Sequence, residues 1–171
     1  YAGAAPTGSA SEAEYLELAL AEVLEPATVH AQLDESLPDG LDVLAVTVSD
    51  GGSLADLLEA SHWRIALDSE PRVAEQEVEE FLAAPEVLVE RMTKKGMREF
   101  DSRDAVVSMA VLHDDAGNVQ LDMVLRHSTP AVRPDDVLRG LGSVAGLDAG
   151  PSPLMTRLAQ GRLTPEGGIG D

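Results

Sequence analysis

Two neighbouring stretches with the alternation of β-strands constrain the fold of this chain more than any other feature. They cover residues 105–112 and 119–125, and the segment Asp114–Asn118, rich in turn-forming residues, separates them. In the second stretch every other position is apolar: Val119, Leu121, Met123 and Leu125. Because successive side chains of a strand point to opposite faces, the pattern predicts an antiparallel hairpin with one face on a core.

Helical and strand-like patterns surround this hairpin in a regular order. We predict a strand over residues 62–67, an amphipathic helix within 69–85, a hairpin with strands 87–94 and 97–101, a helix after Pro134, and a last strand over 154–163. This is the order of a ferredoxin-like βαββαβ unit with an extra hairpin, in which helices lie on one face of an antiparallel sheet. The predicted fold class is α+β, with this unit over residues 61–164 and a flexible tail over 165–171.

Residues 1–60 predict an incomplete unit of the same kind, so that two ferredoxin-like units stand in tandem. Apolar residues spaced by four after Pro26 predict a helix up to Leu37, and residues 41–48 form a β-rich run before a short helix over 53–59. Residues 11–20 fit two structures. Ser11 and Glu14 imitate a helical capping box, whereas leucines at 16, 18 and 20 alternate as in a strand, and we choose the strand.

The incomplete unit lacks an opening strand and helix. Its sheet face, which bears Leu16, Leu18, Leu44 and Val46, is therefore expected to be uncovered. We expect a segment upstream of Tyr1, or a neighbouring molecule, to pack on that face.

The composition is that of an acidic globular protein without cysteine. The chain has 171 residues, 44% of them hydrophobic, a formal net charge of −19 and no cysteine, which excludes disulfides, iron–sulfur ligation, thiolate zinc sites and a cysteine nucleophile. Such a charge opposes unspecific adhesion to nucleic acid or anionic lipid. No apolar run approaches the roughly 18 to 20 residues that cross a bilayer, and no secretion signal opens the chain, so we expect a soluble cytoplasmic protein.

The positive charges are concentrated in one predicted hairpin. The first 63 residues contain no Lys or Arg, whereas five of the twelve cations fall between positions 91 and 103: Arg91, Lys94, Lys95, Arg98 and Arg103. Salt screens charges beyond roughly 8 Å at physiological ionic strength, so a basic hairpin can act independently of distant acids. We predict a binding surface for a phosphate or an acidic partner; the alternative is that these charges protect an edge strand from aggregation.

A second group of candidate residues precedes the helix that follows Pro134. Arg126, His127 and Arg133 stand just before its N-terminus, where backbone N–H groups favour an anion. Asp135 and Asp136 in the first turn can satisfy the same groups from within the chain.

No motif of catalysis, metal binding or nucleotide binding occurs in the sequence. The four histidines are isolated, and neither a nucleophile elbow nor a phosphate-binding glycine loop is present, so the sequence identifies no catalytic residue, and we predict no metal and no cofactor. The chain has only five aromatic residues, and single-stranded RNA usually stacks on aromatic side chains. Any contact with RNA would therefore depend on charge and shape.

Several stretches resemble a bacterial family of unknown function, the radical SAM-linked proteins, encoded beside or fused to cobalamin-binding radical SAM proteins. The matching stretches are residues 5–8, 11–16, 37–43, 93–96, 100–101 and 133–135. Similar family members carry further residues in front, including a basic helix. The resemblance implies an accessory role to a radical SAM enzyme that modifies RNA. The iron–sulfur cluster chemistry would lie in that partner, because this chain has no cysteine.

We interpret the chain as a non-catalytic binding or adaptor module whose basic hairpin contacts the radical SAM partner, its RNA substrate, or both. The alternative is an RNA-processing or RNA-modifying enzyme. Its active site would lie near Arg91, Arg126 or His127 and would be completed by a segment upstream of Tyr1.

Overall fold

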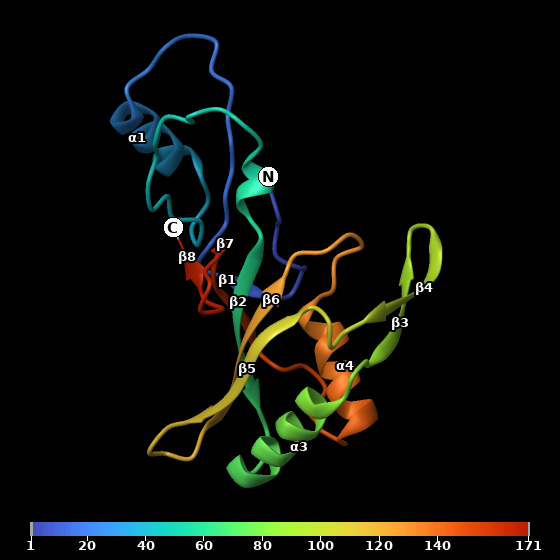
Figure 1. The fold of residues 1–171 in the computed structure, drawn as a ribbon. Helices are drawn as coiled ribbons and strands as arrows, with labels where there is room; N and C mark the ends of the chain where they lie inside the picture. The colour runs from blue at the N-terminus through green and yellow to red at the C-terminus, as the bar shows by residue number, and fades with distance from the viewer. Residues whose placement is uncertain (1, 171) are drawn as a thin grey trace.

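The predicted central hairpin is present and forms one edge of the main sheet. The computed structural model describes residues 2–170 (Figure 1). Strands β5 (Val106–His113) and β6 (Val119–Arg126) pair antiparallel, and the Asp114 carboxylate accepts hydrogen bonds from the backbone N–H groups of Ala116 and Asn118 in the turn between them. Local turn chemistry thus fixes the register that the alternating pattern requires.

The sheet continues from this hairpin in the order β5-β6-β2-β7-β1. Strand β2 (Ala60–Leu67) pairs antiparallel with β6 on one side and with β7 (Met155–Leu163) on the other, and β1 (Ala10–Ser11) is parallel to β7. Strand β8 (Ile169–Gly170) pairs with the end of β7. A second sheet consists of β3 (Leu88–Thr93) and β4 (Gly96–Asp101) alone.

Two helices cover one face of the main sheet and bury its apolar side chains. In Figure 1, α3 (Pro71–Ala83) and α4 (Pro134–Val144) lie on the same side of the strands. Phe81 of α3 and Leu141 of α4 are fully buried in one cluster with Ile65 and Leu121, which face each other across β2 and β6. Burying a side chain of this size stabilises the fold by about 1.5–3 kcal/mol. The predicted mixed, mainly antiparallel fold is confirmed.

The remaining helices lie outside this core. Helices α1 (Pro26–Ser36) and α2 (Leu54–Leu57) complete the four helices of the described residues. None of these four has the length and apolar character that a bilayer crossing needs. The helix expected after Pro26 is confirmed, and the one expected over 53–59 is reduced to a single turn.

Two strands expected in the first part of the chain are wrong. Of the strand expected over residues 11–20, only Ser11 lies in a strand, β1, and residues 41–48 have no regular structure. The expected exposure is partly present, since Leu16, Leu18 and Leu44 are exposed and Val46 is half-buried, but they do not form a sheet face. A β-rich run becomes a strand only where another strand pairs with it, and none lies beside residues 41–48 in the described chain.

The segment expected as a flexible tail carries hydrogen-bonded structure up to residue 170. A turn at Thr164–Gly168 reverses the chain, so that Ile169 pairs with Leu163 and Gly170 with Arg162. A Cβ on Gly161 would lie 2.5 Å from the Gly170 carbonyl oxygen, so the absence of a side chain permits this approach.

The close contact of α4 with α3 and with the base of the β3–β4 hairpin gives a stability test. Replacement of Gly140 by alanine would place a Cβ against the Ser102 hydroxyl and 3.0 Å from Val87 Cγ1. We expect Gly140→Ala to lower the free energy of unfolding by about 1–3 kcal/mol in urea denaturation, because overpacking outweighs the better helix propensity of alanine.

Gly142 on the same helix is the matched control. It is exposed, and a Cβ there meets only the Leu147 carbonyl oxygen, at 3.2 Å. Gly142→Ala should change the unfolding free energy by less than about 1 kcal/mol. Equal losses in the two variants would contradict the proposed packing.

Candidate docking site at the basic hairpin

The tip of the β3–β4 hairpin carries three exposed cations. Lys94 and Lys95 form the turn, where Gly96 has a φ of +101°, and Arg98 follows on β4. The Thr93 hydroxyl donates to the Gly96 carbonyl oxygen (2.9 Å) and accepts from the Lys95 backbone N–H (3.2 Å). Within residues 2–170 the side chains of the three cations have no ion-pair or hydrogen-bond partner. Their charge is therefore available to another molecule.

Arg91, in contrast, points back into the protein. Its guanidinium donates to the Asp136 carboxylate and to the Ala131 carbonyl oxygen (2.9 Å), and it lies over the Phe100 ring, 4.3 Å from the centroid. The side chain is only 16% exposed. An isolated two-stranded hairpin is marginally stable, so this contact, together with the buried Val89 and Phe100, fixes the base of the hairpin.

The N-terminus of α4 is satisfied from within the chain by the same carboxylate. Asp136 is fully buried and accepts from the Arg133 backbone N–H (2.9 Å) as well as from Arg91. Its other oxygen, Oδ1, lies 3.5 Å from Arg139, an ion pair rather than a hydrogen bond. The N-terminus of α4 is thus already occupied by a carboxylate of the chain itself. This is the alternative to an external anion that the sequence indicated.

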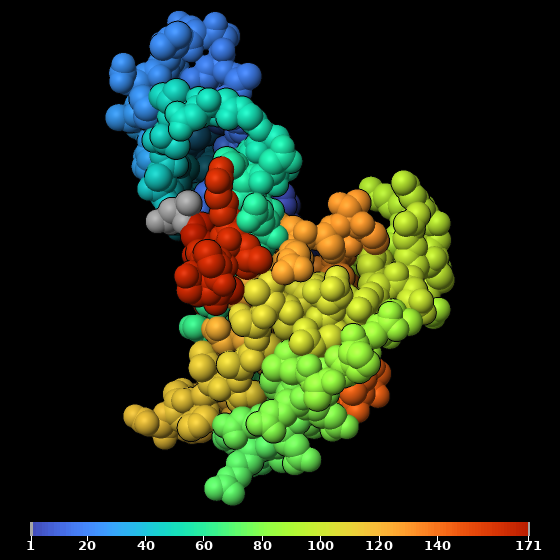
Figure 2. All heavy atoms as spheres, in the orientation of Figure 1, coloured from blue at the N-terminus to red at the C-terminus, as the bar shows by residue number. Residues whose placement is uncertain are grey.

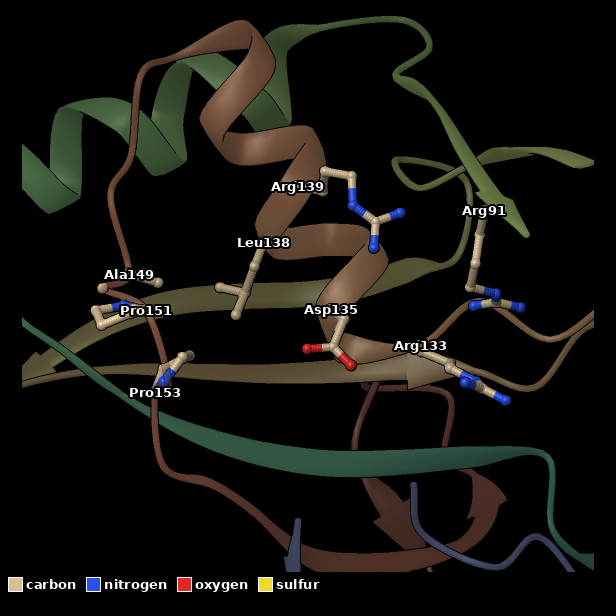
Figure 3. Close-up of a pocket in the computed structure, with 9 residues that line it drawn as sticks. Arg91, Arg133, Asp135, Leu138, Arg139, Ala149, Pro151 and Pro153 are labelled. Carbon is tan, nitrogen blue, oxygen red and sulfur yellow. The ribbon is translucent and has the colours of Figure 1, made fainter. Parts of the chain in front are cut away.

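A hollow of about 440 Å³ lies between α4 and the base of the hairpin (Figure 3). Arg91 reaches toward it from β3, Arg133 stands at the N-terminus of α4 and Arg139 in the middle of that helix, whereas Leu138 points toward the segment 149–153 on the other side. Asp135 and the buried Asp136 offset two of the three arginines. The hollow therefore adds only weak positive charge to that of the tip.

Arg103, the fifth cation of the cluster, has a structural role. Its guanidinium donates to the carbonyl oxygens of Leu82, in the last turn of α3, and of Val106, each at 3.2 Å. A cation at a helix C-terminus is favourable for the helix dipole. The structure thus separates the five cations into two that hold the hairpin and three that extend from it.

Arg126 and His127 lie at a different place in the fold. They line a hollow of about 560 Å³ with α2 and Leu163. His127 Nδ1–H donates to the Leu58 carbonyl oxygen (2.6 Å), so that Nε2 of the neutral ring accepts from the Ser61 hydroxyl at 2.5 Å. The pKa of His127 is lower than that of an ordinary histidine. The main cause is burial of the ring, although part of the residue is exposed, and the nearby charge of Arg157 acts in the same direction. The hydrogen bond to Leu58 raises the pKa and so opposes these two effects.

Sequence reasoning missed two polar clusters that only the fold brings together. Arg157, 2% exposed, lies over the Trp63 ring and binds Glu14, Ser11 and the Gly3 carbonyl oxygen, which fastens the start of the chain to β7. On the opposite face of the sheet, Asp122 lies between two basic side chains: His62, at 2.9 Å, and Arg64, at 2.9 Å. The pairing register of β2 with β6 would have been enough to suggest the second cluster, because it places Arg64 directly opposite Asp122.

The buried pair of Arg91 and Asp136 predicts a large stability effect. Arg91→Ala leaves the Asp136 carboxylate buried without its main partner, and we expect a loss of about 3 kcal/mol in the free energy of unfolding. Lys95→Ala, at the exposed tip, should stay within about 0.5 kcal/mol of the original chain. Urea denaturation of both variants checks this difference, and similar values for the two would refute the separation of roles.

The lowered pKa of His127 predicts a stability change with pH. Because the unfolded chain binds the proton more readily, stability should fall as the pH drops below the ordinary histidine pKa of 6.5, and level off below the folded-state pKa. His127→Gln should lack this contribution. The difference in unfolding free energy between the two chains, measured from about pH 7.5 to about pH 5, should therefore decrease; a constant difference would rule out the shift.

Comparisons with known proteins place the chain in a family. Neither the curated proteins nor the solved structures include a significant match. Residues 1–134 match the family described as an uncharacterized protein conserved in bacteria, DUF2344, and thus most of the chain, including the hairpin and the start of α4, lies within the matched part. The chain therefore belongs to the DUF2344 family.

Proposed function

We propose that this protein is a non-catalytic adaptor module whose β3–β4 hairpin docks onto an acidic surface of a partner protein. One observation carries the proposal: Lys94, Lys95 and Arg98 stand without partners among the described residues, at the end of a ribbon that projects from the body (Figure 1). The rest of the chain is strongly acidic, so this tip is a local positive field on a negative molecule. Such charges speed association and select the partner.

A protein surface suits the hairpin tip better than RNA does. Met92 and Met97 are cross-strand partners beside the cations, and they are 66% and 55% exposed. Methionine is enriched in protein interfaces, where its flexible side chain adapts to the partner. Phe100, the aromatic residue of the hairpin, is 4% exposed and offers no stacking surface to a base.

The partner that the sequence resemblance suggests is a cobalamin-binding radical SAM protein. An adaptor without cysteine fits such a pair, because the iron–sulfur ligands would belong to the partner. The RNA substrate of that partner is the second candidate ligand for the three cations of the tip.

We also propose that the sheet with α3 and α4 is a ferredoxin-like unit. The support is its topology: strand, helix, two strands, helix, strand, with the antiparallel order β7-β2-β6-β5 and the β3–β4 hairpin inserted after α3. The proposed partial unit before it has less support, because residues 41–48 do not form the strand that it requires.

An RNA-processing enzyme is the alternative, and the Ser61–His127 hydrogen bond is the observation in its favour. A neutral histidine that accepts from a serine hydroxyl has the arrangement of a base with its nucleophile. Ser61, however, is 2% exposed in the middle of the sheet, so a substrate could not reach it without a change in structure. RNA turnover by the isolated chain, abolished by Ser61→Ala, would establish this alternative.

Co-purification with a radical SAM protein tests the adaptor proposal. We expect the original chain to bind a cobalamin-binding radical SAM protein and Lys94→Glu/Lys95→Glu to weaken that binding at least about tenfold by calorimetry, because two attractive contacts become repulsive. Affinity should also fall with added salt. A single-stranded RNA of roughly 20 nucleotides serves as the second probe.

Arg72→Glu/Arg162→Glu is the matched control, since it changes the net charge equally at two exposed positions away from the hairpin. It should leave the affinity nearly unchanged. If both double variants weaken the affinity equally, the effect comes from the change in net charge alone, and docking at the hairpin is refuted. If the chain binds the RNA but not the radical SAM protein, the ligand of the hairpin is nucleic acid and the proposed acidic protein partner is wrong.

A further inference from the structure

Residues 12–57, which we call the acidic lobe, combine exposed apolar side chains with charge of one sign. They contain eleven Asp and Glu residues and no Lys or Arg. Ten of the seventeen large hydrophobic residues that are exposed in the described chain lie here: Tyr15, Leu16, Leu18, Leu20, Val23, Leu37, Leu41, Leu44, Val48 and Leu57. Scattered exposed apolar residues are ordinary, but this density within one short segment marks an interaction surface.

The lobe has almost no core of its own. Only Ala13 and Val29 are buried within it, and α1 buries a single residue. Figures 1 and 2 show α1 and the loops around it standing away from the sheet and from helices α3 and α4. A chain orders its backbone at an entropic cost that buried apolar surface normally offsets. In the lobe that surface is present in the sequence but faces outward.

Two parts of the lobe lie next to each other, and both contain exposed apolar residues. The Ser49 hydroxyl donates to the Glu17 carboxylate at 2.6 Å, which brings the segment with Leu16 and Leu18 next to Val48. Val48 is 71% exposed, and Leu44, four residues earlier, is 79% exposed. Both adjoining segments thus combine exposed apolar residues with carboxylates.

We propose that the acidic lobe binds a basic amphipathic segment of another protein. The apolar face of that segment would cover Leu18, Leu44 and Val48, and its Lys or Arg residues would pair with carboxylates such as Glu17, Asp42 and Asp50. The charge selects this occupant: anionic lipid and nucleic acid are repelled by eleven acids, and a second copy of the chain brings its own net charge of −19. This surface is separate from the hairpin of the proposed function.

A designed peptide tests the proposal with the whole 171-residue chain. The probe is a helical peptide of about 18 residues built from leucine and lysine, with leucine at helical spacing, and the control peptide has the same composition in scrambled order. We expect the amphipathic peptide to bind at least about tenfold more tightly, and to protect residues 12–57 from hydrogen exchange. Equal binding of both peptides, or protection elsewhere, would overturn the proposal.

Substitutions in the lobe identify the surface. Leu44→Ser/Val48→Ser removes two exposed side chains, so folding should be unchanged while the affinity for the amphipathic peptide falls at least about tenfold. Leu112→Ser/Leu154→Ser, which removes two exposed leucines outside the lobe, is the matched control and should bind as the original chain does.

Self-association is the competing outcome. If sedimentation shows a dimer that dissociates in Leu44→Ser/Val48→Ser, a second copy covers the lobe and the proposal is wrong. Lys94→Glu/Lys95→Glu should leave binding of the amphipathic peptide intact, so that failure of the hairpin proposal and failure of this one remain distinguishable.

Discussion

The buried ion pair between Arg91 and Asp136 connects the two elements on which the direction of the hairpin depends, the β3–β4 hairpin itself and helix α4. Asp136 holds the first turn of α4 through the Arg133 backbone N–H, and Arg91 holds the β3–β4 hairpin through the same carboxylate and through Phe100. Neither charge could remain in this position alone, because an unpaired buried charge is strongly unfavourable. The direction of the hairpin is thus coupled to the placement of a helix on the main sheet.

This pairing also decides how the basic cluster should be understood. In the sequence, Arg91, Arg98 and Arg103 are equivalent members of one run. In the fold, Arg103 binds carbonyl oxygens at the end of α3, Arg91 binds Asp136, and only Arg98 remains with the two lysines at the surface. Arg139, forty-eight positions after Arg91, joins Arg91 and Arg133 at the hollow instead. The proposed docking surface is smaller than the sequence predicted, and its cations are closer to the turn.

The helices and strands that were predicted best are those specified by a local pattern of residues. Alternation with a turn at Asp114–Asn118 was sufficient for β5 and β6, and an amphipathic pattern was sufficient for α3. Residues 41–48 have the composition of a strand, yet no strand pairs with them, and composition cannot report whether a partner exists. The side chains around Arg157 and His127 come together only through pairing between distant strands, so no spacing in the sequence indicated them.

The acidic lobe and the hairpin tip carry charges of opposite sign, and Figure 1 shows them in separate regions of the molecule. Such a separation gives the protein a permanent electric dipole moment in addition to its net charge. In the field of a charged complex the molecule would rotate before contact, so that encounters begin in a preferred orientation. The proposed adaptor would thereby distinguish a negative from a positive neighbour while still at a distance.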